Sequence, residues 1–420
     1  MSLVLRIKDR IFYGWVIVAV ALITIATFFG IRFSFGVFFK SLASEFELSR
    51  AATSSVFSAS MVLAAIFGII TGWALDRYGP RLVVSLMGLF TGLSLLITSQ
   101  TTSTWQLFLS YSLLLAIGTA GTVVALVPVV SRWFDKKRGV AIGIATSGTG
   151  LGTLVVAPVA AYLISNLGWR MSFIVLGLVA WLVVISLAML LKRDPREIGD
   201  LPDGAKSSTD GAESIDREVD SQQLGFSIGQ ALRNRNFWLI FTSWLSLATC
   251  LSLIMTHVVP YATDLGFSTI QASTILSLIG GIQILARLSV GRISDIVGRK
   301  VPGITCALIA TGALIWLIQS HNLWMFYLFA IVFGIAYGGI GVVNLALVSD
   351  LFGRRNLGTI MGALEVAFST GSAIGAVLGG FIFDVTGSYT TAFIIGAATL
   401  LILALCIGSI TRQETDTVSD

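Results

Sequence analysis

Long, uninterrupted apolar runs are the dominant feature of this chain of 420 residues. Apolar residues make up 55% of the sequence and charged residues only 12%, about half of the roughly 25% found in soluble globular domains. A helix needs about 20 apolar residues to cross a bilayer, and runs of that length recur along the whole chain. The runs are continuous rather than alternating, which excludes a transmembrane β-barrel. The sequence therefore predicts an all-α membrane protein.

Twelve of these runs are predicted to be transmembrane helices. The first follows a basic segment that resembles the start of a signal peptide, but its apolar part is too long and lacks a clear cleavage site, so we interpret it as a span. The predicted limits are 12–39, 51–75, 82–99, 104–131, 139–165, 170–191, 236–263, 270–293, 302–319, 323–349, 358–384 and 389–410.

The distribution of Lys and Arg predicts the orientation. With a cytoplasmic N-terminus, 22 of these residues fall inside and only Lys40, Arg50 and Arg170 fall outside. Cytoplasmic loops carry an excess of Lys and Arg, so both termini are predicted to be cytoplasmic. The same bias accounts for the net charge of +5, and we expect no nucleic-acid partner.

The sequence also contains an internal repeat. Gly72-x-x-x-Asp76-x-x-Gly79 recurs as Gly291-x-x-x-Asp295-x-x-Gly298, a shift of 219 residues. Six predicted spans in each copy make the copies run in the same sense. We therefore expect two parallel six-helix halves, 1–191 and 236–420, joined by a cytoplasmic linker 192–235, with the substrate between the halves near the midplane.

The segment Gly72-Trp-Ala-Leu-Asp76-Arg77-Tyr-Gly79-Pro80-Arg81 resembles the loop signature of the major facilitator superfamily. Tyr13-Gly14-Trp15 and Arg132-Trp133-Phe134-Asp135 resemble, more narrowly, its monocarboxylate transporter and oxalate/formate antiporter branch. The resemblance implies a transporter rather than an enzyme, in the plasma membrane or, in a bacterium, the inner membrane, with a monomer as the transport unit. Four charged residues of the two repeated loops are predicted to form a conformational latch: Asp76, Arg77, Arg81 and Asp295.

Three charged residues lie well inside the predicted spans: Arg32, Arg287 and Glu365. Each such charge costs about 2.5–3.5 kcal/mol on insertion scales and needs a reason. Arg287 either snorkels or clamps the substrate carboxylate, whose geometry matches the guanidinium fork. The branch usually carries Asp-x-x-x-Arg here, whereas this chain has Gln283, which shares the face of Arg287 and is predicted to orient it or bind substrate. Arg32 either snorkels outward or contributes to the site.

Four further polar residues are candidates. Glu365 is predicted to carry the proton or to pair with Arg287, and His257 is either a surface histidine or an outer gate and the second choice for the proton. Tyr337 is predicted to contact substrate, while Asn344 serves substrate or helix packing. The shift of 219 pairs the charged second-half residues with uncharged ones in the first half, which predicts an anion site in the second half facing an apolar wall.

These features predict symport of a lactate- or pyruvate-like monocarboxylate with a proton. One alternative is an organic-anion exchanger of the oxalate/formate type without proton coupling, favoured by two pore cations. Proton-driven efflux of apolar drugs is disfavoured by Arg287. A membrane enzyme is disfavoured because the sequence shows no catalytic cluster, and a receptor because it shows no extracellular domain. With two His, three Cys and neither CxxC nor HExxH, no metal or cofactor is expected.

Overall fold

The computed structural model describes residues 12–198, 201, 203, 226, 228–353 and 357–411. Its elements are helical throughout this part of the chain. Most of the predicted linker 192–235 lies outside the described residues, as do the basic residues at 6–10 and at positions 354, 355 and 412.

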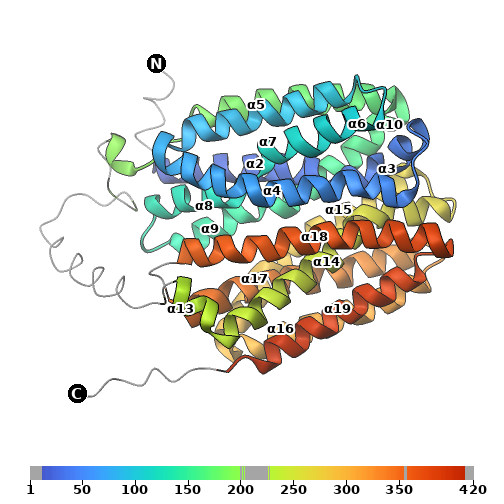
Figure 1. Cartoon of the computed structure of the whole chain (residues 1–420). Helices are drawn as coiled ribbons and strands as arrows, with labels where there is room; N and C mark the ends of the chain where they lie inside the picture. The colour runs from blue at the N-terminus through green and yellow to red at the C-terminus, as the bar shows by residue number, and fades with distance from the viewer. Residues whose placement is uncertain are drawn as a thin grey trace, which may run out of the picture.

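The helices form two groups, seen as two bundles in Figure 1, the first blue to green and the second yellow to red. The first group contains α2 (Tyr13–Phe33), α3 (Phe35–Glu45), α4 (Arg50–Tyr78), α5 (Pro80–Thr98), α6 (Thr104–Leu107), η1 (Phe108–Leu114), α7 (Leu115–Thr119), α8 (Thr122–Trp133), α9 (Arg138–Thr146), α10 (Gly148–Ala180), η2 (Trp181–Ile185) and α11 (Ser186–Ala188), followed by η3 (Pro195–Ile198). The second contains α13 (Ile228–Arg233), α14 (Arg235–Asp264), α15 (Thr269–Val297), α16 (Lys300–Ile318), α17 (Leu323–Phe352), α18 (Leu357–Thr386) and α19 (Thr390–Ser409).

The helix bounds reproduce the sequence repeat. Helices α4 and α15 have 29 residues each and are offset by 219 at both ends, and α17 has the same offset from the segment 104–133. Gly79 and Gly298 follow α4 and α15 with φ of 81° and 91°. Glycine adopts this left-handed region without a Cβ penalty, so the chain turns sharply into the next helix in both copies. The repeat is thus a repeat of the backbone.

Ten helices among the described residues are long and apolar enough to cross a membrane, which is fewer than the twelve predicted spans. The predicted spans 139–165 and 170–191 fall in one run, Arg138–Ala188, that contains the non-helical Gly168. The predicted span 104–131 is divided by the π-helical segment η1 and by a left-handed residue at Gly121. The first span continues to Glu45, beyond its predicted end at 39.

Three helix pairs join the two groups: α4 packs along α18, α10 along α15, and α3 against α14. We call the end of the molecule that contains the turns after α3 and α14 the Asp264 end, and the end that contains the turns at Gly79 and Gly298 the Gly79 end. They lie at the right and the left of Figure 1.

Candidate functional site

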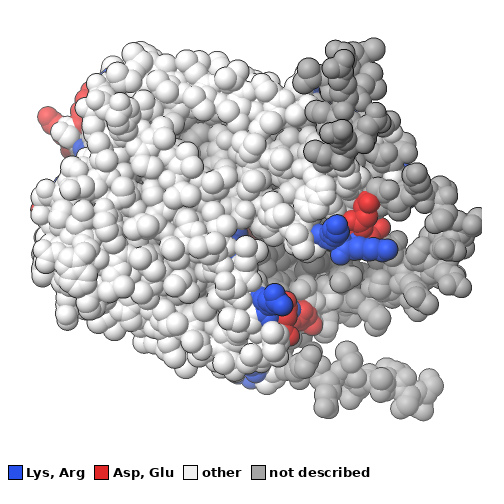
Figure 2. All heavy atoms as spheres, turned by 180° about the vertical axis from the view of Figure 1, so that it is seen from behind, with Lys and Arg blue, Asp and Glu red and all other residues white. Residues whose placement is uncertain are grey.

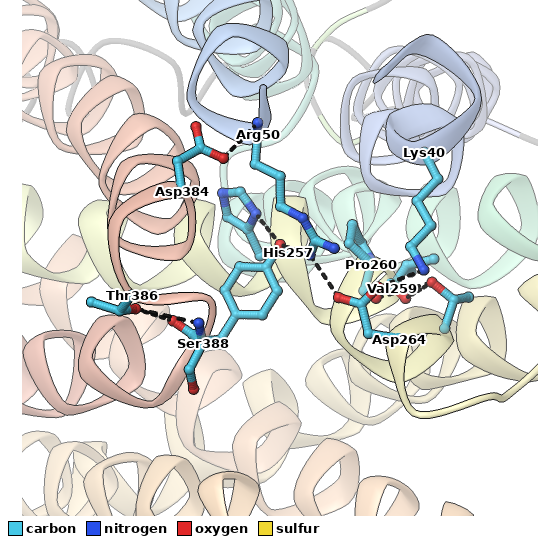
Figure 3. A network of polar contacts seen from close by, with 11 residues as sticks. Lys40, Arg50, His257, Val259, Pro260, Asp264, Asp384, Thr386 and Ser388 are labelled. Atoms are coloured by element: carbon cyan, nitrogen blue, oxygen red, sulfur yellow. Dashed lines mark hydrogen bonds and ion pairs between the residues drawn. The ribbon is translucent and has the colours of Figure 1, made fainter. Parts of the chain in front are cut away.

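A network of charged groups joins the two helix groups at the Asp264 end (Figure 3). Lys40 Nζ and Arg50 Nη1 each lie 2.7 Å from a carboxylate oxygen of Asp264. The backbone N–H groups of Arg50 and Ala51 donate to the Asp384 carboxylate at 2.9 and 2.8 Å. Asp384 therefore satisfies and charge-stabilises the first turn of α4 from the other side of the interface. The second group supplies both carboxylates, and the first group supplies the cations and the helix end.

The Arg50 guanidinium also enters an aromatic cluster. Its central carbon lies 3.5 Å from the ring centroid of Phe383, and Nη1 donates to the Tyr389 hydroxyl at 2.6 Å. Burial raises the pKa of the Tyr389 phenol, although Arg50 acts in the opposite direction. The phenol therefore keeps its proton and can donate it in a hydrogen bond.

His257 lies directly behind Tyr389. Its Nδ1 is 3.2 Å from the Tyr389 hydroxyl and its Nε2 is 2.7 Å from the carbonyl oxygen of Ala376. A carbonyl only accepts, so we assign the ring proton to Nε2, and Nδ1 accepts from Tyr389. The side chain is 0% exposed. The interpretation of His257 as a surface histidine is therefore wrong, and its role as a gate stays a prediction.

The Gly79 end differs. Among the described residues, no ion pair joins the two helix groups there. Arg299 contacts Asp295 and, at 3.1 Å, Asp350, all in the second group. Figure 2 shows a hollow between the two groups near this end, flanked by basic and acidic side chains.

The predicted latch residues are not brought together in this state. Asp76 and Arg77 are exposed, and neither forms an ion pair with a described residue. Arg81 contacts Met189 of its own group at 3.5 Å. Asp295 is bound to Arg299 instead. A latch between the groups at this end remains a prediction about another state.

Arg287 lies between the two ends. Its Nη1 donates across the interface to the Thr146 carbonyl at 3.0 Å, and its guanidinium interacts with the Tyr337 phenol. Its Nε has no partner among the described residues, and neither has Oε1 of the buried Gln283, one turn earlier on α15. The side chain is directed into the interface, so the snorkelling interpretation is wrong. The Arg287 Nε–H and the Gln283 Oε1, both on α15, therefore have no hydrogen-bond partner among the described residues.

Arg32 and Glu365 are the other two charged residues of the interior. Arg32 is 6% exposed, and its Nε lies 3.1 Å from Met61 Sδ. Outward snorkelling is therefore wrong for this residue too. Glu365 is half-buried, and the cation that acts on it is Arg32 rather than the expected Arg287. The two side chains attract each other without forming an ion pair. Among the residues that the structure describes, the interior thus contains two cations and one carboxylate.

Asn344 is 1% exposed, and its Oδ1 accepts from Ser243 at 3.2 Å. Its Nδ2 has no partner among the described residues, nor has the Trp244 indole N–H or the Ser369 hydroxyl. Asn344 therefore contributes to packing and also presents a free donor. Sequence reasoning missed Trp244, although a tryptophan in the middle of a span was a visible signal.

Sequence reasoning also missed the network at the Asp264 end. The available signal was that Asp264 and Asp384 lie at span ends predicted to be outside, on the same side of the membrane as the few outside cations. Within the described residues, no group of three or more His, Cys, Asp or Glu is arranged to hold a metal ion.

The family model of the Major Facilitator Superfamily matches residues 20–318 and 282–419. The chain belongs to the Major Facilitator Superfamily. Monocarboxylate transporter 13 of Bos taurus is 27% identical over 404 residues, covering 93% of this chain and 87% of that protein. Monocarboxylate transporter 4 of Gallus gallus is 26% identical, with coverages of 94% and 83%. These relatives place the chain in the monocarboxylate transporter-like branch, as a multi-pass membrane transporter rather than an enzyme.

Solved structures of other superfamily members share the fold. The D-xylose-proton symporter aligns with a TM-score of 0.75 at 16% identity, covering 95% of this chain and 98% of that one. A bacterial homologue of the human lysosomal transporter Spinster, in an inward-facing and unoccupied conformation, aligns with a TM-score of 0.72 at 18% identity, covering 95% and 96%. At these identities the likeness concerns the fold alone.

Proposed function

We propose that the protein moves small monocarboxylates of the lactate or pyruvate type together with a proton, by alternating access. The observation that carries this proposal is Arg287. Its guanidinium donates to the Thr146 carbonyl and interacts with the Tyr337 phenol, and among the described residues its Nε has no partner and it forms no ion pair. A carboxylate matches the donor fork of a guanidinium in both charge and shape. The names of the relatives support the same substrate class.

The transport cycle is a rocking of residues 1–191 against 236–420, with the linker 192–235 between them. The bias of Lys and Arg assigns the Gly79 end to the cytoplasm. The closed Asp264 end then faces outward, in the plasma membrane or, in a bacterium, the inner membrane. In this assignment the structure represents a state open to the cytoplasm, and a single chain contains the complete path.

Glu365 is the proposed proton carrier, and Arg32 is the residue that couples it to the substrate. A substrate carboxylate that enters the interior competes with Glu365 for the charge of Arg32. Glu365 then loses its stabilising partner and takes up a proton. Substrate and proton therefore bind together, as symport requires. Tyr337 and Gln283 flank Arg287, and Asn344 supplies a further donor.

Uptake of radiolabelled lactate into proteoliposomes, with and without an inward proton gradient, tests the proposal. Arg287→Lys keeps the charge but loses the fork, so we expect uptake to fall more than tenfold, and Arg287→Ala should reduce it to background. Glu365→Gln should abolish accumulation against the lactate gradient. Near-normal uptake by Arg287→Ala would refute the carboxylate site.

Anion exchange without a proton is the alternative, and the presence of both Arg32 and Arg287 in the interior favours it. The same proteoliposomes distinguish the two functions. An exchanger takes up labelled anion only when unlabelled anion is trapped inside, and a proton gradient alone does not drive it. Accumulation driven by the gradient in empty vesicles identifies the symporter.

A further inference from the structure

We propose that Tyr389 is a positioning residue that couples proton uptake by His257 to the release of the Asp264 end. The three side chains form one hydrogen-bonded chain: Arg50 donates to the Tyr389 hydroxyl, Tyr389 donates to His257 Nδ1, and His257 Nε2–H donates to the Ala376 carbonyl. In the transport cycle this gives the outward-facing end a proton-sensitive closure that is separate from the proton carrier Glu365.

The neutral imidazole satisfies every group in this chain. The phenol oxygen accepts one N–H from Arg50 at 2.6 Å, and its own O–H is directed to Nδ1 at 3.2 Å. The ring cannot turn away, because Nε2 is held by Ala376 and the ring packs against Phe39 at 5.3 Å between centroids. The closed state is therefore built around an unprotonated Nδ1.

A proton on Nδ1 reverses the direction of one hydrogen bond. Nδ1–H must then donate to the Tyr389 oxygen, which already accepts from Arg50. The phenol hydrogen loses its acceptor, and two cations face one oxygen atom. Like charges at this separation in a partly buried site repel strongly.

The charged groups around His257 do not offset the positive charge that its protonation adds. The charged groups in this network are Lys40 from α3, Arg50 from α4, Asp264 from α14 and Asp384 from α18. Two cations and two carboxylates balance when His257 is neutral. Protonation leaves one positive charge in excess at the Asp264 end, where Arg50 joins the two helix groups. Arg50 then leaves Tyr389, and its hold on Asp264 weakens with it.

Distances between spin labels across the interface test the proposal without reference to any substrate. Gln100→Cys and His321→Cys place labels on exposed positions of the two groups at the Asp264 end, in a chain whose three native cysteines are replaced by alanine. The second change also leaves His257 as the one histidine of the chain, since the sequence has two. A free imidazole, with an ordinary pKa of about 6.5, is mostly neutral at pH 7.5 and mostly protonated at pH 5.5. We therefore expect acidification over this range to raise the ratio of open to closed populations about tenfold.

Two variants isolate the coupling. Tyr389→Phe removes only the hydroxyl and His257→Gln removes the titrating group, so each should reduce the pH response to less than twofold. Tyr261→Phe is the matched control. Tyr261 lies in the same aromatic cluster, 5.9 Å from Tyr389 between ring centroids, and its hydroxyl bonds Leu317 instead. This variant should keep the tenfold response.

A parental protein whose label distances do not change with pH overturns the inference, and so does a full response in Tyr389→Phe. An equal loss in Tyr261→Phe also overturns it, because the effect would then belong to the aromatic cluster and not to the hydrogen-bonded chain. None of these outcomes bears on monocarboxylate transport, which the uptake assays measure separately.

Discussion

The two ends of the interface are built from the same repeated helices but are closed in different ways. At the Asp264 end, two cations and a helix N-terminus of the first group bind two carboxylates of the second. At the Gly79 end, the charged groups that do pair, around Arg299, pair within one group. Backbone symmetry therefore does not impose chemical symmetry. The contacts between the groups, and not the repeat itself, determine which end is shut.

The largest expected effect comes from fixing the closed end permanently. Ser58 Oγ on α4 donates to the Ala373 carbonyl on α18 at 2.6 Å, so these positions are neighbours across the interface. In a chain without its native cysteines, oxidation of the double variant Ser58→Cys/Ala373→Cys should reduce uptake to background, because the Asp264 end can no longer open. Reduction should restore uptake, and the single variants should be insensitive to oxidant. Unimpaired transport by the cross-linked protein would mean that transport does not require this end to open.

A smaller effect is expected when the closure is only weakened. Arg50→Ala removes the contacts with Asp264, Tyr389 and Phe383. Hydrogen bonds to charged groups contribute about 1.5–3 kcal/mol, so the open population of this end should rise at least tenfold, measured with the same spin-label pair.

Glu45→Gln is the control for Arg50→Ala. The Glu45–Arg170 pair lies at the same end, but both residues belong to the first group and the side chains are 41% and 38% exposed. Exposed pairs contribute about 0–1 kcal/mol, so the populations should change less than threefold. Equal effects of the two variants would show that loss of any charge pair loosens this end.

The smallest effect is expected at the Gly79 end. Asp76 forms no ion pair with a described residue here, so Asp76→Asn should leave the present state unchanged and destabilise only a state in which this end is shut. Turnover should fall about threefold while the KM for substrate stays within twofold, measured as initial uptake over a range of concentrations. A raised KM at unchanged turnover would place Asp76 in the binding site and remove the latch.

Much of the fold could be predicted from the sequence, because span length and the 219-residue repeat are local and periodic properties. The bounds of α4 and α15 follow that repeat at both ends. The number of candidate spans was harder to predict. A helix that a π-helical segment interrupts, as in 104–131, still looks like one apolar run in the sequence. The non-helical Gly168 lies between the predicted spans 139–165 and 170–191, so the backbone breaks where the sequence predicts a boundary.

The site was only partly predictable, for a physical reason. Arg287 and Glu365 stand out because a charge inside an apolar run is costly wherever it points. Their partners do not stand out. Arg50 and Asp384 are 334 residues apart, and nothing local indicates that they meet. The same limit applies to Glu365, which the sequence predicts to carry the proton or to pair with Arg287, whereas the cation that acts on it is Arg32.

The way Asp384 holds α4 affects how the sequence can vary. Its carboxylate binds two backbone N–H groups, and every residue except proline supplies that group. Substitutions at position 51 therefore leave this contact in place, whereas nearly any substitution at position 384 removes it. Random mutagenesis should tolerate many side chains at 51 and few at 384. One side of this closure is thus free to drift, while the other is under constraint.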